Sequence, residues 1–316
     1  MQNVLDPAIL FFLLGLLAGA LRSNLEVPAP IAKFLSLYLL MALGLKGGFA
    51  LAESGLGLEM VKSLGAAMFL AAVVPLIGYA MLRKAVSRFD AAAVAAAYGS
   101  VSAVTFVTAL QALEGQGMPA SGHMVVAMVL MESPAVIMAV LLAHRLRRGK
   151  SGGAASLPHV LREAFTDGSL ILLLGAMAVG LASGEPGKVM MQPFSGDLFK
   201  GMLAFFLLDM GLLVARHFDT ARRSSPVLVA YALGAPLLHA AMALALAALL
   251  DLGVADGTVL MVLAASASYI VVPAALRNAI PEANPAIYFG LALGLTFPLN
   301  LVVGIPLYTW AAQQVL

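Results

Sequence analysis

Tyr98-Gly-Ser-Val-Ser-Ala-Val-Thr105 and Ala264-Ala-Ser-Ala-Ser-Tyr269 are the two stretches that decide the fold of this chain. Each is a patch of small, hydroxyl-bearing residues inside a long hydrophobic run, and Pro273 closely follows the second. Such residues predict that both helices are interrupted. Lipid cannot hydrogen-bond the peptide groups that an interruption releases, so a break at that depth has to line a cavity enclosed by protein. Paired breaks in corresponding halves of a chain indicate the substrate site of a transporter.

The composition excludes most soluble functions. Of the 316 residues, 62% are hydrophobic and 11% are charged, whereas about 25% are charged in soluble domains. The net charge of +2 gives no reason to expect a nucleic acid partner. There is no cysteine, and the five histidines show no metal-ligand spacing. Since the chain also lacks a phosphate-binding loop, we predict a polytopic membrane protein that is not an enzyme.

Hydrophobic runs of about 20 residues are long enough to span a bilayer, and their number predicts an all-α protein with ten transmembrane helices. The predicted spans are 6–21, 29–51, 60–82, 89–111, 122–144, 166–183, 195–215, 226–250, 256–279 and 287–312. A basic linker rich in glycine and serine, 145–165, separates a first five-helix repeat (1–144) from a second one (166–316).

The two halves correspond helix by helix. Pro75 in the third span matches Pro236 in the eighth, and Pro134 in the fifth matches Pro298 in the tenth. The interrupted spans are the fourth and the ninth, which also correspond. Because five is an odd number, the second copy has to enter the membrane from the opposite side. The sequence therefore predicts two inverted repeats with discontinuous helices four and nine.

Basic residues predict the orientation, because cytoplasmic loops carry an excess of lysine and arginine. With the linker 145–165 in the cytoplasm, the outer side holds only four of the 18 basic residues: Lys46, Lys62, Lys188 and Lys200. Both termini then face outward from the inner (plasma) membrane.

The two breaks supply the predicted substrate site. Its residues are Gly99, Ser100, Val101, Ser102 and Thr105 from span four, with Ser266, Ser268, Tyr269 and Ile270 from span nine. The exposed N–H groups of half-helix N-termini favour an anion, and carbonyl groups at the opposite ends can hold a small cation. The alternative is that these small residues only allow close helix packing.

Ionisable residues inside the membrane are costly and indicate function. Glu132, two residues before Pro134, is predicted to form an ion site with Ser102 and Ser268, although its carboxyl could instead bond to a neighbouring helix. Lys46 and Asp209 occupy matched places in spans two and seven and are predicted to form a structural ion pair. Beyond a possible sodium ion, no cofactor or metal is expected.

At these residues the chain resembles the sodium-dependent bicarbonate transporter family known from cyanobacteria. The motifs that carry the resemblance are the two break segments, Leu43-Gly-Leu-Lys-Gly-Gly48, Pro273-Ala-Ala-Leu-Arg277 and Ile280-Pro-Glu-Ala-Asn-Pro-Ala-Ile-Tyr288. The resemblance implies a core of spans three to five and eight to ten that moves against a gate of spans one, two, six and seven. It also implies bicarbonate between the two breaks with sodium nearby, a homotrimer, and a PII-like soluble regulator. Span nine departs from the family pattern, with Tyr269 where characterised members have aspartate.

The leading hypothesis is a secondary active transporter that imports a small anion, most simply bicarbonate with sodium, by alternating access. One alternative is a proton- or sodium-coupled transporter of a small organic acid, because Tyr269, Val271 and Val272 make the ninth span more apolar than the family pattern. Another alternative is a channel or a membrane sensor that does not transport.

Overall fold

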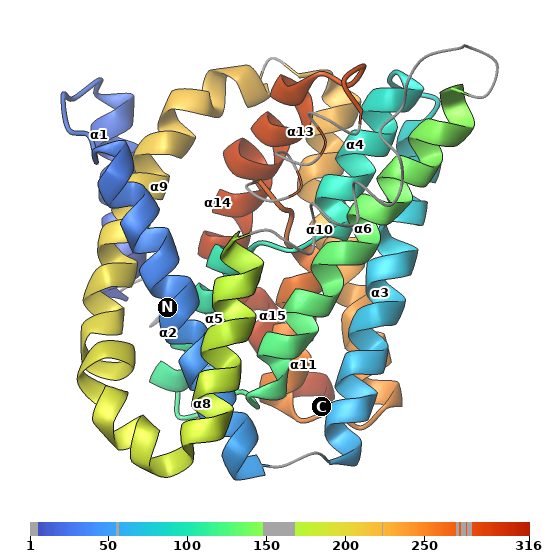
Figure 1. Ribbon diagram of the computed structural model, residues 1–316. Helices are drawn as coiled ribbons and strands as arrows, with labels where there is room; N and C mark the ends of the chain where they lie inside the picture. Colours follow the sequence, from blue (N-terminus) through green and yellow to red (C-terminus); the bar gives the residue numbers. More distant parts are fainter. Residues whose placement is uncertain are drawn as a thin grey trace.

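The computed structural model describes residues 6–54, 57–147, 168–222, 224–269, 272, 276 and 280–316. Within these residues the secondary structure is helical throughout (Figure 1), as predicted. Most of the predicted linker 145–165 lies outside the described residues, and so do Ile270, Val271 and Pro273.

The helices of the first half of the chain are α1 (Pro7–Ala20), α2 (Ala29–Ser54), α3 (Leu58–Leu82), α4 (Arg88–Gly99), α5 (Ala103–Gly115) and α6 (His123–Arg147). The second half begins with α8 (Gly168–Gln192), the π-helical turn η2 (Pro193–Asp197), α9 (Leu198–Arg222), α10 (Pro226–Leu249) and α11 (Val254–Ala265). A continuous helical run then passes through α13 (Pro285–Leu291), η3 (Ala292–Thr296), α14 (Phe297–Leu299), η4 (Asn300–Gly304) and α15 (Ile305–Val315).

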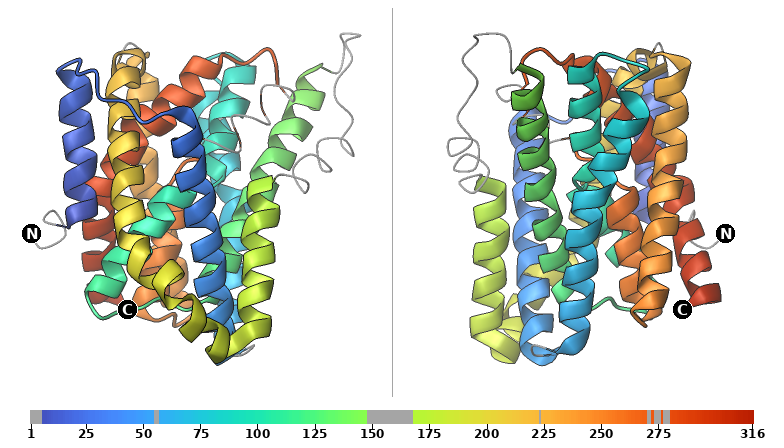
Figure 2. Two further views of the ribbon diagram at one scale, coloured as in Figure 1. Left: turned by 60° about the vertical axis from the view of Figure 1, so that its left-hand side comes forward. Right: turned by 90° about the vertical axis from the view of Figure 1, so that its right-hand side faces the viewer.

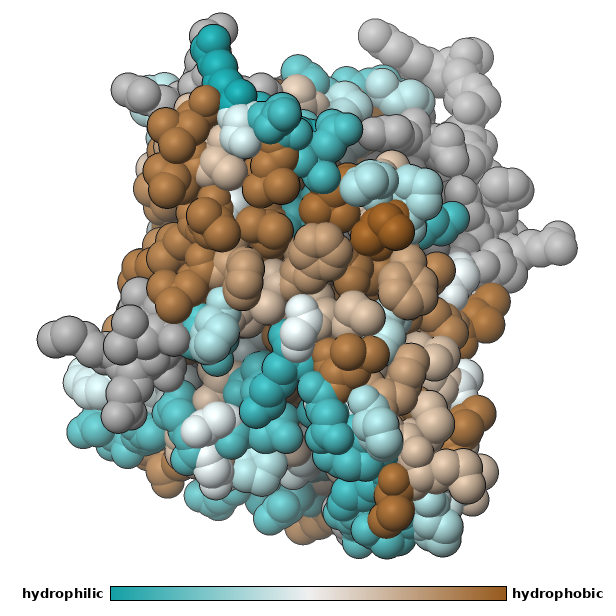
Figure 3. Space-filling model, turned by 90° about the vertical axis from the view of Figure 1, so that its left-hand side faces the viewer, coloured by the Kyte–Doolittle hydropathy of each residue, from teal (hydrophilic) through white to brown (hydrophobic). Residues whose placement is uncertain are grey.

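Six helical segments among the described residues are long and apolar enough to cross a membrane. They are Ala29–Glu53, Leu58–Leu82, Arg88–Gly115, Ile171–Phe218, Pro226–Leu249 and Pro285–Val315. Shorter apolar helices cover Pro7–Ala20, His123–Glu132 and Val254–Ala265. One side of the molecule correspondingly shows a hydrophobic band with hydrophilic residues above and below it (Figure 3).

Glycines bring two pairs of helices into close contact. A Cβ atom on Gly15 of α1 would overlap the Leu208 carbonyl of α9, and one on Gly211 of α9 would overlap the Phe12 carbonyl of α1. A Cβ atom on Gly48 of α2 would likewise overlap the Met177 carbonyl of α8. Figure 2 accordingly shows α2 and α8 side by side at one edge of the molecule. Small residues let membrane helices approach backbone to backbone, so α1 pairs with α9 and α2 pairs with α8.

Two glycines mark changes in helix direction. Gly184 has φ of 54° inside α8 and kinks it, close to the predicted end of the sixth span at residue 183. Gly99 ends α4, and any side chain there would clash with the ring of Pro75 on α3. The absence of a side chain at Gly99 therefore lets α3 pack directly against the first break.

Candidate functional site

The two interrupted segments meet each other inside the protein. The Ser102 N–H donates to the Ser266 hydroxyl at 2.9 Å, and the Ser268 N–H donates to the Ala97 carbonyl at 2.7 Å. All four residues are buried. The breaks between α4 and α5 and after α11 were predicted from the sequence, and their contact gives each break a partner for backbone groups that lipid could not satisfy.

Serine hydroxyls accept from backbone N–H groups that follow each break. Ser102 Oγ accepts from the Thr105 N–H at 3.2 Å at the start of α5, and from the Thr105 hydroxyl at 3.0 Å. Ser268 Oγ accepts from the Val272 N–H at 3.2 Å. The two serines thus act alike: each accepts from a backbone N–H three or four residues farther along the chain, and at Ser102 that N–H belongs to the first turn of α5.

The carbonyl end of α11 is also satisfied by side chains. Ser266 Oγ donates to the Leu263 carbonyl at 2.9 Å, and Asn300 Nδ2 donates to the Ala265 carbonyl at 2.8 Å. The Tyr308 hydroxyl holds Asn300 by donating to its Oδ1 at 2.9 Å. Asn300 of η4 therefore replaces part of the hydrogen-bond ladder that ends at Ala265. By contrast, the buried Ser100 Oγ has no hydrogen-bond partner among the described residues.

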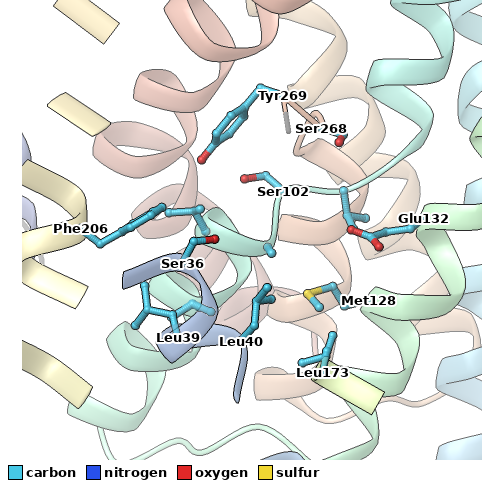
Figure 4. Close-up of a pocket in the computed structure, with 14 residues that line it drawn as sticks. Ser36, Leu39, Leu40, Ser102, Met128, Glu132, Leu173, Phe206, Ser268 and Tyr269 are labelled. Carbon is cyan, nitrogen blue, oxygen red and sulfur yellow. The ribbon is translucent and has the colours of Figure 1, made fainter. Parts of the chain in front are cut away.

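A cavity lies beside the crossing of the two segments (Figure 4). Its water-accessible volume is about 60 Å³, and a single water needs roughly 10–15 Å³ on this measure. The lining residues are Ser36, Leu39, Leu40, Val101, Ser102, Ala103, Val104, Val107, Met128, Glu132, Leu173, Phe206, Ser268 and Tyr269. The space therefore suits a solute of a few non-hydrogen atoms.

Polar groups reach this cavity from both segments and from α6. Figure 4 shows the hydroxyls of Ser102 and Tyr269 pointing into the space, with the carboxyl of Glu132 at its α6 side. Tyr269 packs edge-on against Phe297, with ring centroids 5.2 Å apart. Its hydroxyl also contacts Met210 Sδ of α9 at 4.0 Å. Tyr269 thus bridges the second break and the α1–α9 pair.

Only part of the predicted site lines the cavity. Val101, Ser102, Ser268, Tyr269 and Glu132 do so. Gly99, Ser100, Thr105 and Ser266 lie in or next to the breaks but are not lining residues of the cavity, while Ile270 is outside the described residues.

The sequence reasoning missed the opposite wall. It consists of Ser36, Leu39 and Leu40 of α2, Leu173 of α8 and Phe206 of α9. Ser36 was the one available signal, because it is a hydroxyl residue within the apolar run Phe34-Leu-Ser-Leu-Tyr38. The leucines carry no signal of their own, since nothing distinguishes them from lipid-facing or core leucines.

The predicted ion pair of Lys46 with Asp209 is wrong. Lys46 Nζ lies 3.2 Å from Glu114 Oε2 at the end of α5, and 4.7 Å from the centre of the Phe199 ring of α9. Asp209 is ten residues beyond Phe199, which corresponds to about 15 Å along a helix. Lys46 therefore faces the end of α9 that is remote from Asp209, and it pairs with the carboxylate within reach.

The comparisons identify the family. A search of curated proteins finds no match to this chain. The model of the Na+-dependent bicarbonate transporter superfamily, however, matches residues 7–313, nearly the whole chain. The resemblance based on the break motifs is confirmed, and so is the prediction that the protein is not an enzyme. This multi-pass membrane protein belongs to the Na+-dependent bicarbonate transporter superfamily.

Proposed function

We propose that this protein is a secondary active transporter that imports bicarbonate together with sodium. The observation that carries the proposal is the crossing of two interrupted segments beside a small cavity lined by Ser102, Ser268, Tyr269 and Glu132. Family membership suggests the same solute and the same ion.

The anion occupies the cavity next to the start of α5. The N-terminus of that helix is buried at the break, and its partial positive charge favours an anion. The hydroxyls of Ser102 and Tyr269 provide donors beside it. Sodium binds on the α6 side, where Glu132 supplies negative charge and Ser102 and Ser268 supply hydroxyl oxygens, which are the hard ligands that such a cation takes.

The cavity lies between two groups of helices, and this position supports alternating access. α2, α8 and α9 form one wall, whereas α5, α6 and the second break form the other. The first group corresponds to the gate and the second to the core. Sliding of the core along the gate would carry the solute between the two membrane surfaces while the Ser102–Ser266 contact, which is internal to the core, stays intact.

The glycine contacts support two inverted five-helix repeats with ten spans. Gly15 and Gly19 of α1 contact Gly211 and Ala215 of α9 in the same chain direction, so these helices run parallel. Gly44 and Gly48 of α2 contact Ala176 and Gly180 of α8, again in the same direction. Parallel contacts of span one with span seven, and of span two with span six, are what an inverted second half requires.

Matching contacts at the two ends of the core support the same repeat. Asp90, in the first turn of α4, accepts from the Asn284 N–H at 2.7 Å just before α13. Asp256, in the first turn of α11, accepts from the Ser121 N–H at 2.8 Å just before α6. The same sequence separation relates Asp90 to Asp256, Ser100 to Ser266 and Ser102 to Ser268.

The outward termini follow from the charge distribution, and the homotrimer and the PII-like regulator rest on the family resemblance alone.

The test is uptake of labelled bicarbonate into proteoliposomes. We expect uptake to require an inward sodium gradient, and to be lost in Ser102→Ala, because that variant lacks both the α5 cap and a ligand of the site. Ser183→Ala is the matched control, since that hydroxyl bonds within α8, to the Val179 and Gly180 carbonyls, and Ser183 does not line the cavity. Uptake that ignores sodium, or that survives in Ser102→Ala at the level of the control, contradicts the proposal.

A small organic acid is the second candidate solute. The observation in its favour is the apolar wall of the cavity, which includes Leu39, Leu40, Met128, Leu173 and Phe206. Such a wall suits a carboxylate with a short hydrocarbon chain better than it suits a fully hydrated ion. Inhibition of bicarbonate uptake by propionate, but not by formate at the same concentration, would favour this candidate.

A further inference from the structure

A second cavity lies in the same seam between the two groups of helices. Its water-accessible volume is about 290 Å³, and it is lined by α2, α8, η2 and α9 on one side and by α5, the loop that follows it and α6 on the other. We call it the second cavity. Its ionisable lining residues are Lys46, Glu53, Glu114 and Lys188, and Gln111 and Gln192 add amide groups.

The second cavity lies along the same helices as the first. On α2 the first cavity touches Leu40 and the second touches Lys46; on α5 the first touches Val107 and the second touches Gln111. Six residues of helix correspond to about 9 Å. Along α2 the second cavity is therefore within about 9 Å of the site between the breaks, on the same seam.

The two lysines of the second cavity differ in how fully their charge is neutralised. Lys188 Nζ lies 2.5 Å from Glu53 and 3.6 Å from Glu185, so two carboxylates share it. Lys46 has one carboxylate, Glu114, and the face of the Phe199 ring. The side chains of Lys46 and Glu114 are 31% and 51% exposed, and ion pairs with that much exposure contribute little to stability. Lys46 can therefore exchange Glu114 for another anion at little cost.

Gln111 supplies an independent indication of a ligand. Its side chain is 6% exposed, it lines the second cavity, and its Oε1 has no hydrogen-bond partner among the described residues. It precedes Glu114 by three residues on α5, so both side chains lie on the same face of that helix. A buried amide oxygen without a donor is unfavourable. A solute that reached this oxygen with an O–H group would satisfy it.

We propose that the second cavity is a loading site for the transported anion, which rests on the proposed function. In this site Lys46 releases Glu114 and binds the negative oxygens of the incoming anion, while Gln111 accepts from its hydroxyl group. The chemical class that satisfies both residues is a monoprotonated oxyanion, such as hydrogencarbonate. Nitrate and chloride carry the charge but lack the donor, so Gln111 selects against them.

The kinetic test compares variants of Lys46 and Glu114, because a loading site predicts that their KM values for bicarbonate change in opposite directions. Lys46→Gln removes the anion's counter-charge, and we expect the KM for bicarbonate to rise about fivefold, the size of one exposed charge contact. Glu114→Gln frees Lys46, and we expect KM to fall about twofold. Lys200→Gln is the matched control. It also removes a lysine charge, next to Phe199 at the start of α9, but Lys200 does not line the second cavity. If the pair were only a latch between core and gate, both variants would shift KM in the same direction and the charge swap Lys46→Glu with Glu114→Lys would restore it; that result overturns the proposal.

A second measurement does not depend on transport. The chain has no cysteine, so Gln192→Cys places a single thiol in the lining of the second cavity. The ratio of its modification rates by an anionic and a cationic methanethiosulfonate reports the local charge. We expect Glu114→Gln to raise this ratio about threefold and Lys46→Gln to lower it similarly.

Protection of the same thiol tests the ligand. We expect bicarbonate to slow its modification, nitrate at equal ionic strength to have little effect, and Gln111→Leu to abolish the difference between the two anions. Equal protection by both anions overturns the role of Gln111, and an unchanged rate ratio overturns the role of Lys46. Protection by bicarbonate in a protein that shows no uptake would retain the loading site while rejecting the proposed function.

Discussion

The hydroxyl of Ser266 accepts a hydrogen bond from the backbone N–H of Ser102 at 2.9 Å, so a side chain of one interrupted segment satisfies the backbone of the other. The same hydroxyl donates to the Leu263 carbonyl at 2.9 Å. One serine therefore serves a released donor and a released acceptor where water is excluded. This double role makes Ser266 a structural residue of the crossing and not a lining residue of the cavity.

Ser266→Ala is expected to destabilise the protein by about 1–3 kcal/mol, because it leaves a buried N–H and a buried carbonyl without partners. The measurement is thermal unfolding in detergent, together with bicarbonate uptake. Ser63→Ala is the control: its hydroxyl is buried but has no partner among the described residues, so its loss should leave the melting temperature unchanged or raise it. Equal melting temperatures for the two variants would contradict the role assigned to Ser266.

Gly211→Ala is expected to separate α1 from α9. The new methyl group would overlap the Phe12 carbonyl and the Leu16 backbone, and overpacking of this kind typically costs about 1–3 kcal/mol. Gly234→Ala on α10 is the matched control, because nothing lies within 4 Å of its Cβ position, and alanine favours a helix over glycine by about 0.5–1 kcal/mol. The melting temperature should therefore fall for the first variant and rise for the second; a rise in both would show that the α1–α9 contact tolerates a wider spacing.

Asn300→Leu is expected to lower stability and to abolish uptake, because it removes the donor to the Ala265 carbonyl at the end of α11. Tyr308→Phe should have a smaller effect of about 1 kcal/mol, since it removes only the hydrogen bond that orients Asn300. Thermal unfolding and uptake are measured for both variants. A larger loss in Tyr308→Phe than in Asn300→Leu would assign the important contact to the tyrosine.

Glu132→Gln is expected to raise the sodium concentration for half-maximal uptake by about tenfold or more, because a neutral amide lacks the charge that a cation site needs. Glu132→Asp should retain part of the sodium response. The exposed Glu59 at the start of α3, which lines neither cavity, gives the control Glu59→Gln. An unchanged sodium dependence in Glu132→Gln would place the cation elsewhere.

The sequence was informative where glycine, serine or proline interrupts an otherwise apolar membrane helix. Gly99, Ser102 and Ser268 indicated the two breaks, since hydroxyl groups can bond to the backbone groups that a break releases. Pro134 and Pro298 are among the residues on which the proposed correspondence of the halves rests. The family followed from the same motifs.

The rest depended on packing between helices that are distant in the chain. Leu39, Leu40 and Phe206 form a wall of the first cavity only because α2 and α9 happen to face the breaks there. Likewise, Lys46 is bound to Glu114 because the end of α5 lies within its reach. The sequence shows which segments are apolar enough to be helices in the membrane. It does not show which apolar face of one helix packs against which neighbouring helix.

The short length of α1 has a consequence for the surrounding lipid. Its 14 residues extend over about 21 Å, whereas the hydrocarbon layer of a typical bilayer is about 30 Å thick. Leu10, Leu14 and Leu17 are exposed along this short helix. For α1 as the predicted first span, a mismatch of this size predicts a thinner adjacent membrane, so the protein should prefer lipids with shorter acyl chains on that side. Its turnover should therefore depend on acyl-chain length even when headgroups and ion gradients are held constant.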